Sequence, residues 1–426
     1  GTTDRIPVEL AVLLERELRE AMGEEVRVAL CPLPNLNFIY ADVGSDIGRL
    51  FKGLCDWLSK EALEELPSGA NSGEAKRLLD ERPVIPRSHI LIGFQYAMAD
   101  DILFNSVLFH ELGHDVFHSS RLWEQYGDNY KDELDAALEE APPYRDRKES
   151  GEGSLILRKA VDACTRWTSE VFTDAFACAL AGPHFAFAMS DLFRLKPKPR
   201  PNVFSNSHPA DRVRQESQHH VLTSCGWFTP PNEVEASFRD RAITVFDELR
   251  VVGLEEDPEE WDIEQWKFDA LMKQTSLSRN AIRCIVKVFF KHIRKIGNQA
   301  VEKAKDFQNR SSEFWQLGAD VQSALEEHAV VPSTIVTARK AIGLQPATVS
   351  PDDKPTYTYH PRPSTVLNCA RLIVESGTDS LVQTCYPGKA APFEREDVAR
   401  ARYLLSEWVR KAIGDYNLLQ DAHYGH

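Results

Sequence analysis

The order of hydrophobic and polar residues predicts a small mixed unit of strands and helices before residue 100. Apolar positions in residues 8–22 recur with the spacing of an amphipathic helix. Residues 25–30 (EVRVAL), 37–43 (NFIYADV) and 89–94 (HILIGF) are rich in β-branched and aromatic side chains, which is typical of strands. Residues 45–66 return to helical spacing. The start of the chain therefore predicts three strands accompanied by helices.

Beyond residue 100 the pattern is mostly helical, with a few interruptions. Residues 121–153 are charged and contain Pro-Pro and Gly-Glu-Gly, so we predict a partly helical, mobile insertion with little apolar surface to anchor it. A long helix follows over about 154–180, and the Ala-Gly-Pro at 181–183 breaks or kinks it. Residues 345–363 contain five prolines and predict a linker or extended arm. The fold class expected from this pattern is α+β and mostly helical.

These interruptions also divide the chain into expected parts, because a chain of 426 residues is too long for one ordinary core. The predicted parts are an α+β domain over 1–225 that contains the 121–153 insertion, a helical region over 226–344, the proline-rich linker over 345–363 and a C-terminal helical segment over 364–426.

Charge and cysteine usage narrow the class of protein. The formal net charge of −15 argues against a nucleic-acid partner and against anionic membrane surfaces. The longest apolar run, AFACALAGPHFAFAM, is shorter than the roughly 20 residues that a membrane span needs. The eight cysteines are scattered without a CxxC pair, and the first residues lack the apolar core of a signal peptide. We therefore expect a cytoplasmic protein with reduced thiols and no membrane partner.

The segment SVLFHELGHDVFH contains the pattern most suggestive of chemistry. His110 and His114 are four residues apart, so on a helix both imidazoles point the same way, about 6 Å apart, and can bind one metal ion. Glu111 lies about 100° round the helix, where a carboxylate can accept a proton from a water that Zn²⁺ has acidified. This HExxH arrangement, inside an apolar helix and directly after a strand, predicts a catalytic Zn²⁺ site.

A catalytic zinc needs a third protein ligand, and the chain offers three candidates. His118 lies eight residues from His110 on the same helix and would reach the same ion only if the helix bent. Glu170 and Asp174 lie one turn apart within the nearly apolar WTSEVFTDAFACAL, where carboxylates require partners. We favour Glu170 as the ligand and Asp174 as the acceptor that orients a ligand histidine, with Asp174 itself as the other possible ligand.

Two motifs together resemble known families. HELGH followed by EVFTDAFA is similar to the gluzincin pattern of HExxH and a later ExxxD, and Glu170 to Pro183 resembles the ImmA/IrrE family of soluble bacterial metallopeptidases. SHPADRVR (207–214) resembles an element of the HtpX and CAAX-prenyl-protease branch. The resemblance spans about 85–215 and implies a zincin-like metallopeptidase fold for the 1–225 domain, with a small sheet and an active-site helix. It also implies that His208 stabilises the oxyanion and that Arg214 supports the site, where it could reach Glu170 or Asp174.

The resemblance implies a zinc-dependent endopeptidase that cleaves a protein or peptide substrate, with Glu111 as general base. The helical 215–426 region would then recognise the substrate or control access. The strand at 89–94 fits two arrangements equally well, an edge strand that pairs with an extended substrate or an internal strand of the core sheet. The alternative function is a metal-binding sensor or regulator that acts mainly through protein interaction.

Overall fold

The computed structural model describes residues 8–22, 27–33, 39–42, 89–95, 101–141, 144, 148, 152–195, 201–251, 254, 257–268, 278–304, 310–328, 335–337, 357–359, 361–386 and 388–424. The helices are α1 (Val8–Met22), α4 (Leu108–Ser119), α5 (Leu122–Glu139), α7 (Gly153–Ala181), α8 (Pro183–Leu195), α9 (Asp211–Ser224), α10 (Ala236–Asp247), α12 (Arg279–Lys303), α13 (Arg310–His328), α14 (Pro363–Glu375), α15 (Thr378–Cys385) and α16 (Arg395–Tyr424). The strands are β1 (Arg27–Leu33), β2 (Ile39–Asp42), β3 (His89–Gln95), β4 (Ile335–Thr337) and β5 (Tyr357–Tyr359), and the short 3₁₀ helices are η2 (Asn105–Val107), η3 (Pro258–Glu260) and η4 (Ile263–Gln265). The predicted α+β, mostly helical class is confirmed.

The first sheet is three-stranded and mixed. Its order is β1-β3-β2, with β1 parallel and β2 antiparallel to the central strand β3. Ile90 and Ile92 of β3 are buried, and α1 packs against β1. Because β3 has a partner on each side, the edge-strand alternative for 89–94 is wrong and the internal one holds. The helix predicted over 45–66 lies outside the described residues.

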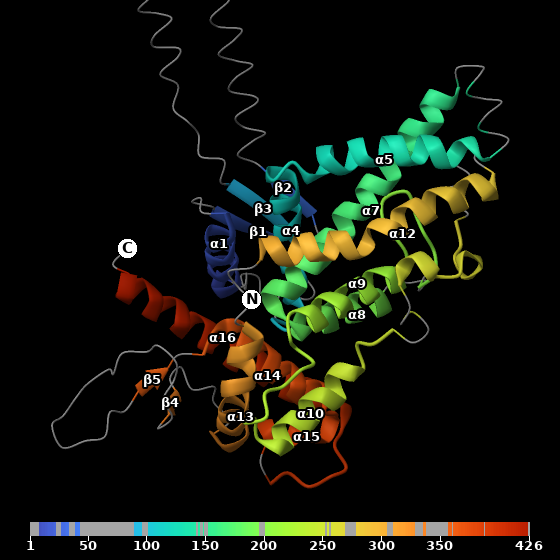
Figure 1. Cartoon of the computed structure of the whole chain (residues 1–426). Coiled ribbons are helices and arrows are strands. Elements are labelled where there is room, and N and C mark those ends of the chain that lie inside the picture. The colour runs from blue at the N-terminus through green and yellow to red at the C-terminus, as the bar shows by residue number, and fades with distance from the viewer. Residues whose placement is uncertain are drawn as a thin grey trace, which may run out of the picture.

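Helix α7 runs through the middle of the molecule, with α5, α9 and α12 around it (Figure 1). Every residue from Glu170 to Ala181 is buried. A helix that is apolar all round needs neighbours on every side, and α4, α5, α9 and α12 supply them. The predicted break is present: Gly182 has φ 74° and separates α7 from α8. A Cβ at this glycine would lie 2.4 Å from the Trp227 ring, so only glycine fits there.

The charged segment after the HELGH helix is a packed helix. Leu122, Tyr126, Tyr130, Leu134 and Leu138 of α5 are all buried. The Tyr126 hydroxyl donates to Gln299 of α12, and the Tyr130 hydroxyl is hydrogen-bonded to Thr168 of α7. The prediction of little anchoring apolar surface is therefore wrong for Leu122–Glu139. A stripe of one large side chain every four residues is enough to bury one helix face, although the average composition is charged.

The C-terminal helices belong to the same hydrophobic core as the N-terminal ones, because one continuous cluster of buried residues extends from Leu10 to Ile413. Helices α10, α13, α14 and α15 gather at one end of the molecule (Figure 1), and α16 packs on α1. The predicted helical region over 226–344 also contains β4, which pairs antiparallel with β5 from the predicted linker. No described helix is long and apolar enough to cross a membrane.

The α5 stripe predicts a measurable effect on stability. Replacing Leu134 by alanine should lower the free energy of unfolding by about 2–5 kcal/mol, the usual loss for a buried leucine. The matched change Gln125→Ala, at an exposed position of the same helix, should alter it by less than about 0.5 kcal/mol. Urea denaturation measures both, and equal effects would mean that α5 does not pack as described.

Candidate metal centre

The candidate site lies where α4 crosses α7, and a glycine permits the crossing. A Cβ at Gly113, the fourth residue of HELGH, would lie 2.6 Å from the Thr173 Cα. Real Cβ atoms do not approach backbone atoms so closely, so a larger residue would push the helices apart. This close approach brings the face of α4 that bears His110 and His114 against the face of α7 that bears Glu170.

Three potential ligands converge at this crossing. One donor atom each from His110, His114 and Glu170 all lie within 4.8 Å of one another. The His110 Nε2 atom is 3.6 Å from Glu170 Oε2, and the His114 Nε2 atom is 3.8 Å from Glu170 Oε1. His118 is exposed, and it does not belong to the group of potential ligands that the described residues form. Two imidazole nitrogens and one carboxylate oxygen, mostly buried and already close together, fit the donor set of a divalent transition metal such as zinc.

Asp174, one turn after Glu170 on α7, is hydrogen-bonded to side chains of both α4 and α9. Its carboxylate is fully buried and lies 2.8 Å from His110 Nδ1, while Arg214 donates from Nε and Nη2 over 2.7 and 2.8 Å. Gln218 adds a third donor at 3.1 Å. An ionised Asp174 accepts the N–H of His110 Nδ1, which leaves the His110 Nε2 lone pair for a metal. Asp174 therefore occupies the orienting position rather than the alternative ligand position.

Arg214 connects both carboxylates, and the contact predicted for it is present. Its Nη1 atom lies 3.2 Å from Glu170 Oε2 in addition to the paired contact with Asp174. Burial alone would raise the pKa of Asp174, but the charge and hydrogen bonds of Arg214, together with His110, hold it below its usual range. The same balance, again dominated by Arg214, lowers the pKa of Glu170. Both carboxylates are thus kept ionised.

The two histidines differ in their surroundings. The His114 Nδ1 atom is hydrogen-bonded to Ser169 Oγ over 3.2 Å, and burial next to His110 lowers the pKa of His114 to about 3. Burial would lower the pKa of His110 too, but the hydrogen bond and charge of Asp174 outweigh it and raise the pKa above its ordinary value. His114 is therefore neutral and ready to bind a metal at neutral pH, whereas His110 gives up a proton when a cation binds.

Glu111 is buried beside the ligand group but does not belong to it. Burial, reinforced by the charges of Glu170 and Asp174, raises the pKa of Glu111 to about 7. Within the described part of the chain, no side chain forms a hydrogen bond or ion pair with its carboxylate. A desolvated carboxylate with a pKa near neutrality can accept and release a proton, as a general base does.

His208 lies at the exposed rim of the site. Its side chain is 54% exposed, and its Nε2 atom lies 3.7 Å from Glu170 Oε2. The turn that carries it is fixed, because Ser205 Oγ accepts the backbone N–H of His208 and Trp167 donates to the Ser205 carbonyl oxygen. His208 is therefore both a turn histidine and a neighbour of Glu170 at the edge of the site.

Several contacts of the site were not predicted from the sequence. Gln218, Ser169 and Thr173 all bind side chains of the site, and Gly113 sets the helix separation. Ser169 and Thr173 flank Glu170 on α7, so helical spacing could have suggested them. Gln218 follows Arg214 by one turn of α9, and this repeat was the available signal for a second donor to Asp174.

The chain matches no family model, no curated protein and no solved structure. The function of this site therefore has to be inferred from its side chains and from the motif resemblance.

The glycine at the helix crossing provides a direct test of the geometry. Gly113→Ala should destabilise the protein by about 1–3 kcal/mol, because the extra methyl group overpacks the crossing. It should also weaken zinc binding at least about 10-fold, since the ligands of α4 and α7 move apart. The control Gly127→Ala, at an α5 position with no atom within 4 Å of the added Cβ, should be neutral or stabilising by up to about 1 kcal/mol. Thermal unfolding and zinc titration of both variants distinguish them, and equal behaviour would refute the close crossing.

Proposed function

We propose that this protein is a zinc-dependent endopeptidase that cleaves a protein or peptide substrate. The observation that carries the proposal is the convergence of His110, His114 and Glu170 within 4.8 Å, with a buried carboxylate, Glu111, beside them. The order HExxH and later ExxxD supports a gluzincin-type, zincin-like domain that resembles the ImmA/IrrE and HtpX groups. The buried free thiols of Cys164, Cys178, Cys369 and Cys385 support a reducing compartment, the cytoplasm.

In the proposed enzyme, His110, His114 and Glu170 hold the metal. A bound Zn²⁺ would supply a Lewis acid that polarises the scissile carbonyl and acidifies water. Three protein ligands leave a coordination position open, as catalytic zinc sites do, whereas structural sites use four protein ligands, often cysteines. The carboxylate of Asp174 is already bound by Arg214, Gln218 and His110, so it is not free to act as a fourth ligand.

Glu111 and His208 carry out the proposed proton transfer and charge stabilisation. Glu111 accepts a proton from the attacking water and passes it to the leaving amine, a task suited to a carboxyl group whose pKa is about 7. His208 donates a hydrogen bond to the carbonyl oxygen as negative charge develops on it. Its exposure marks the side from which a substrate enters, because Glu170 and His114 beneath it have only 12% and 18% of their side chains exposed.

The alternative is a metal-dependent sensor or regulator that acts by protein interaction without hydrolysis. Such a protein would need the three ligands and Asp174 but would have no use for Glu111. A buried carboxylate is costly when the described part of the chain offers it no hydrogen bond or ion pair, so the presence of Glu111 favours the enzyme. The two functions differ in one measurable respect, which is whether Glu111 affects the products formed from other proteins.

The roles of the ligands and the base predict separable effects. Glu111→Gln should keep the metal and the fold but abolish nearly all hydrolysis, because only the base is removed. Glu170→Ala should lose most of its zinc, while His118→Ala, an exposed change on α4, should retain it. The measurements are zinc titration and a comparison of new protein N-termini after incubation of each protein with a cell lysate.

Three results would contradict these assignments. A metal-free Glu111→Gln protein would make Glu111 a ligand. Loss of zinc in His118→Ala but not in Glu170→Ala would point to a three-histidine site. Identical lysate products from the wild-type protein and Glu111→Gln, or no products from either, would refute the endopeptidase and favour the regulatory function.

His208 provides a further prediction for the same reaction. With a substrate identified from the lysate, His208→Ala should lower kcat by about 10²–10³, the effect of losing one oxyanion donor, at normal zinc content. Ser207→Ala, next to it on the same turn, should lower kcat much less because the imidazole remains. An unchanged kcat in His208→Ala would reduce SHPADRVR to a structural turn.

A further inference from the structure

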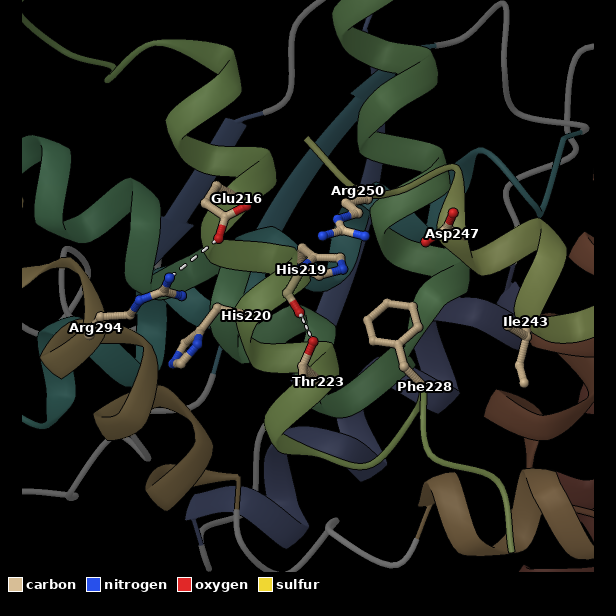
Figure 2. A pocket seen from close by; sticks show the side chains of 9 residues that line it. All are labelled: Glu216, His219, His220, Thr223, Phe228, Ile243, Asp247, Arg250 and Arg294. Atoms are coloured by element: carbon tan, nitrogen blue, oxygen red, sulfur yellow. Dashed lines mark hydrogen bonds and ion pairs between the residues drawn. The ribbon is translucent and has the colours of Figure 1, made fainter. Parts of the chain in front are cut away.

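Two cavities lie along the side of α9 that faces α8, α10 and α12. The first, of about 320 Å³, is bounded by α8, α9 and the residues that follow α10. The second, of about 480 Å³, lies between α9, α10 and α12 (Figure 2). Both are lined by His219 and Arg250, so the two cavities are adjacent, and together they are called the groove. Volumes of this order suit a small organic ligand.

The first cavity is strongly basic. Arg194, Arg212 and Arg250 line it, and Glu248 is its one carboxylate. This excess of positive charge stands out in a chain whose formal net charge is −15. Arg194 is 76% exposed and 3.9 Å from the nearest oxygen of Asp191, whose carboxylate is already bound by Arg371. Among the described carboxylates, none forms an ion pair with Arg250. These three arginines come from α8, α9 and the residues after α10, and a group of guanidinium side chains lining one small cavity suits an oxyanion.

The second cavity differs in its charge and surface. Glu216 and Asp247 line it together with Arg294 and with Arg250, the arginine shared with the first cavity, and Glu216 is paired with Arg294 over 3.5 Å (Figure 2). The apolar part consists of Phe228, which stacks on His219 with ring centroids 4.8 Å apart, and the 38% exposed Ile243. The groove thus combines a basic end with a balanced end that presents an aromatic ring and an aliphatic side chain.

We propose that this groove binds a small organic phosphate, a phosphate monoester with an apolar or aromatic group. Its phosphate lies in the basic cavity among Arg194, Arg212 and Arg250, and its organic group lies against Phe228 and Ile243. This site is separate from the metal centre and does not depend on the peptidase activity.

Helix α9 connects the two sites. Gln218 lines the basic cavity and at the same time donates a hydrogen bond to Asp174, while Arg214 on the preceding turn binds both Asp174 and Glu170. An anion in the cavity adds negative charge next to Gln218, whose side chain also contacts Asp174 of the metal centre. Because this charge attracts a cation, an occupied groove strengthens metal binding, and by linkage a bound metal strengthens anion binding.

Phosphorus NMR titration of the full chain with inorganic phosphate tests the basic end. The wild-type protein should bind, and Arg250→Ala and Arg194→Ala should each bind about 10-fold more weakly. Arg158→Ala, at an exposed position about 24 Å along α7 from Asp174, the α7 residue that Gln218 contacts, should bind as the wild type does. No binding by the wild-type protein up to about 10 mM, or equal binding by all four proteins, overturns the site.

Phenyl phosphate tests the other end of the groove. It should bind the wild-type protein about 3-fold more tightly than inorganic phosphate does, since the ring covers apolar surface. Ile243→Ser, at an exposed position, should remove that difference and leave phosphate binding unchanged. Equal affinities of the two ligands for the wild-type protein overturn the assignment of the organic group to the second cavity.

Zinc titration at constant ionic strength tests the connection through α9. Replacing chloride by sulfate should strengthen zinc binding about 5-fold in the wild-type protein and leave it unchanged in Arg250→Ala. The absence of a sulfate effect overturns the coupling. A protein that binds phosphate but no zinc would instead refute the proposed metal centre and leave the groove intact, so the two failures are distinguishable.

Discussion

The buried pair of Asp174 and Arg214 is the interaction on which the rest of the site depends. A carboxylate without any exposed surface is tolerated only if its charge and hydrogen-bonding capacity are satisfied. Arg214 meets this need with two parallel hydrogen bonds, and Gln218 and His110 supply the others. These contacts join α4, α7 and α9 at one carboxylate. Removal of either charged partner would leave the other buried and unpaired, which typically costs about 3–5 kcal/mol.

The same pair sets the charge available to a metal. Glu170 and Asp174 contribute two negative charges and Arg214 one positive charge, so the buried group has a net negative charge once His110 has given up its proton. Arg214 approaches Glu170 through Oε2, while Oε1 is the oxygen that faces His114. One carboxylate oxygen can therefore bind a cation while the other stays with the guanidinium. This division explains how a ligand can be held in place by an arginine without being neutralised by it.

Local spacing predicted which side chains converge at the candidate site, because these side chains lie on two regular helices. His110 and His114 share one face of α4, and Glu170 and Asp174 share one face of α7, as a spacing of four residues requires. Contacts between elements were harder to foresee. The internal position of β3 depends on its pairing with β2, about 50 residues earlier. The alternation of residues within a strand does not indicate which other strand it pairs with. In α5, most residues are charged or polar, and this composition outweighed the narrow apolar stripe in the prediction. The stripe is buried because α7 and α12 pack against it.

The C-terminal helices hold both ligand-bearing helices in position, which argues against a detachable recognition module. Asp101, before α4, accepts the backbone N–H of Leu103 and Phe104 and pairs with Arg402 of α16 over 3.0 Å. At the end of α7, the side-chain amide of Asn368 donates to the Ala181 carbonyl oxygen and accepts the backbone N–H of His184. Unpaired backbone groups at a buried helix end are costly, so Asn368 of α14 stabilises the break between α7 and α8 by binding these groups. The C-terminal region is therefore part of the structure that holds the start of α4 and the end of α7, the two helices that carry the candidate site.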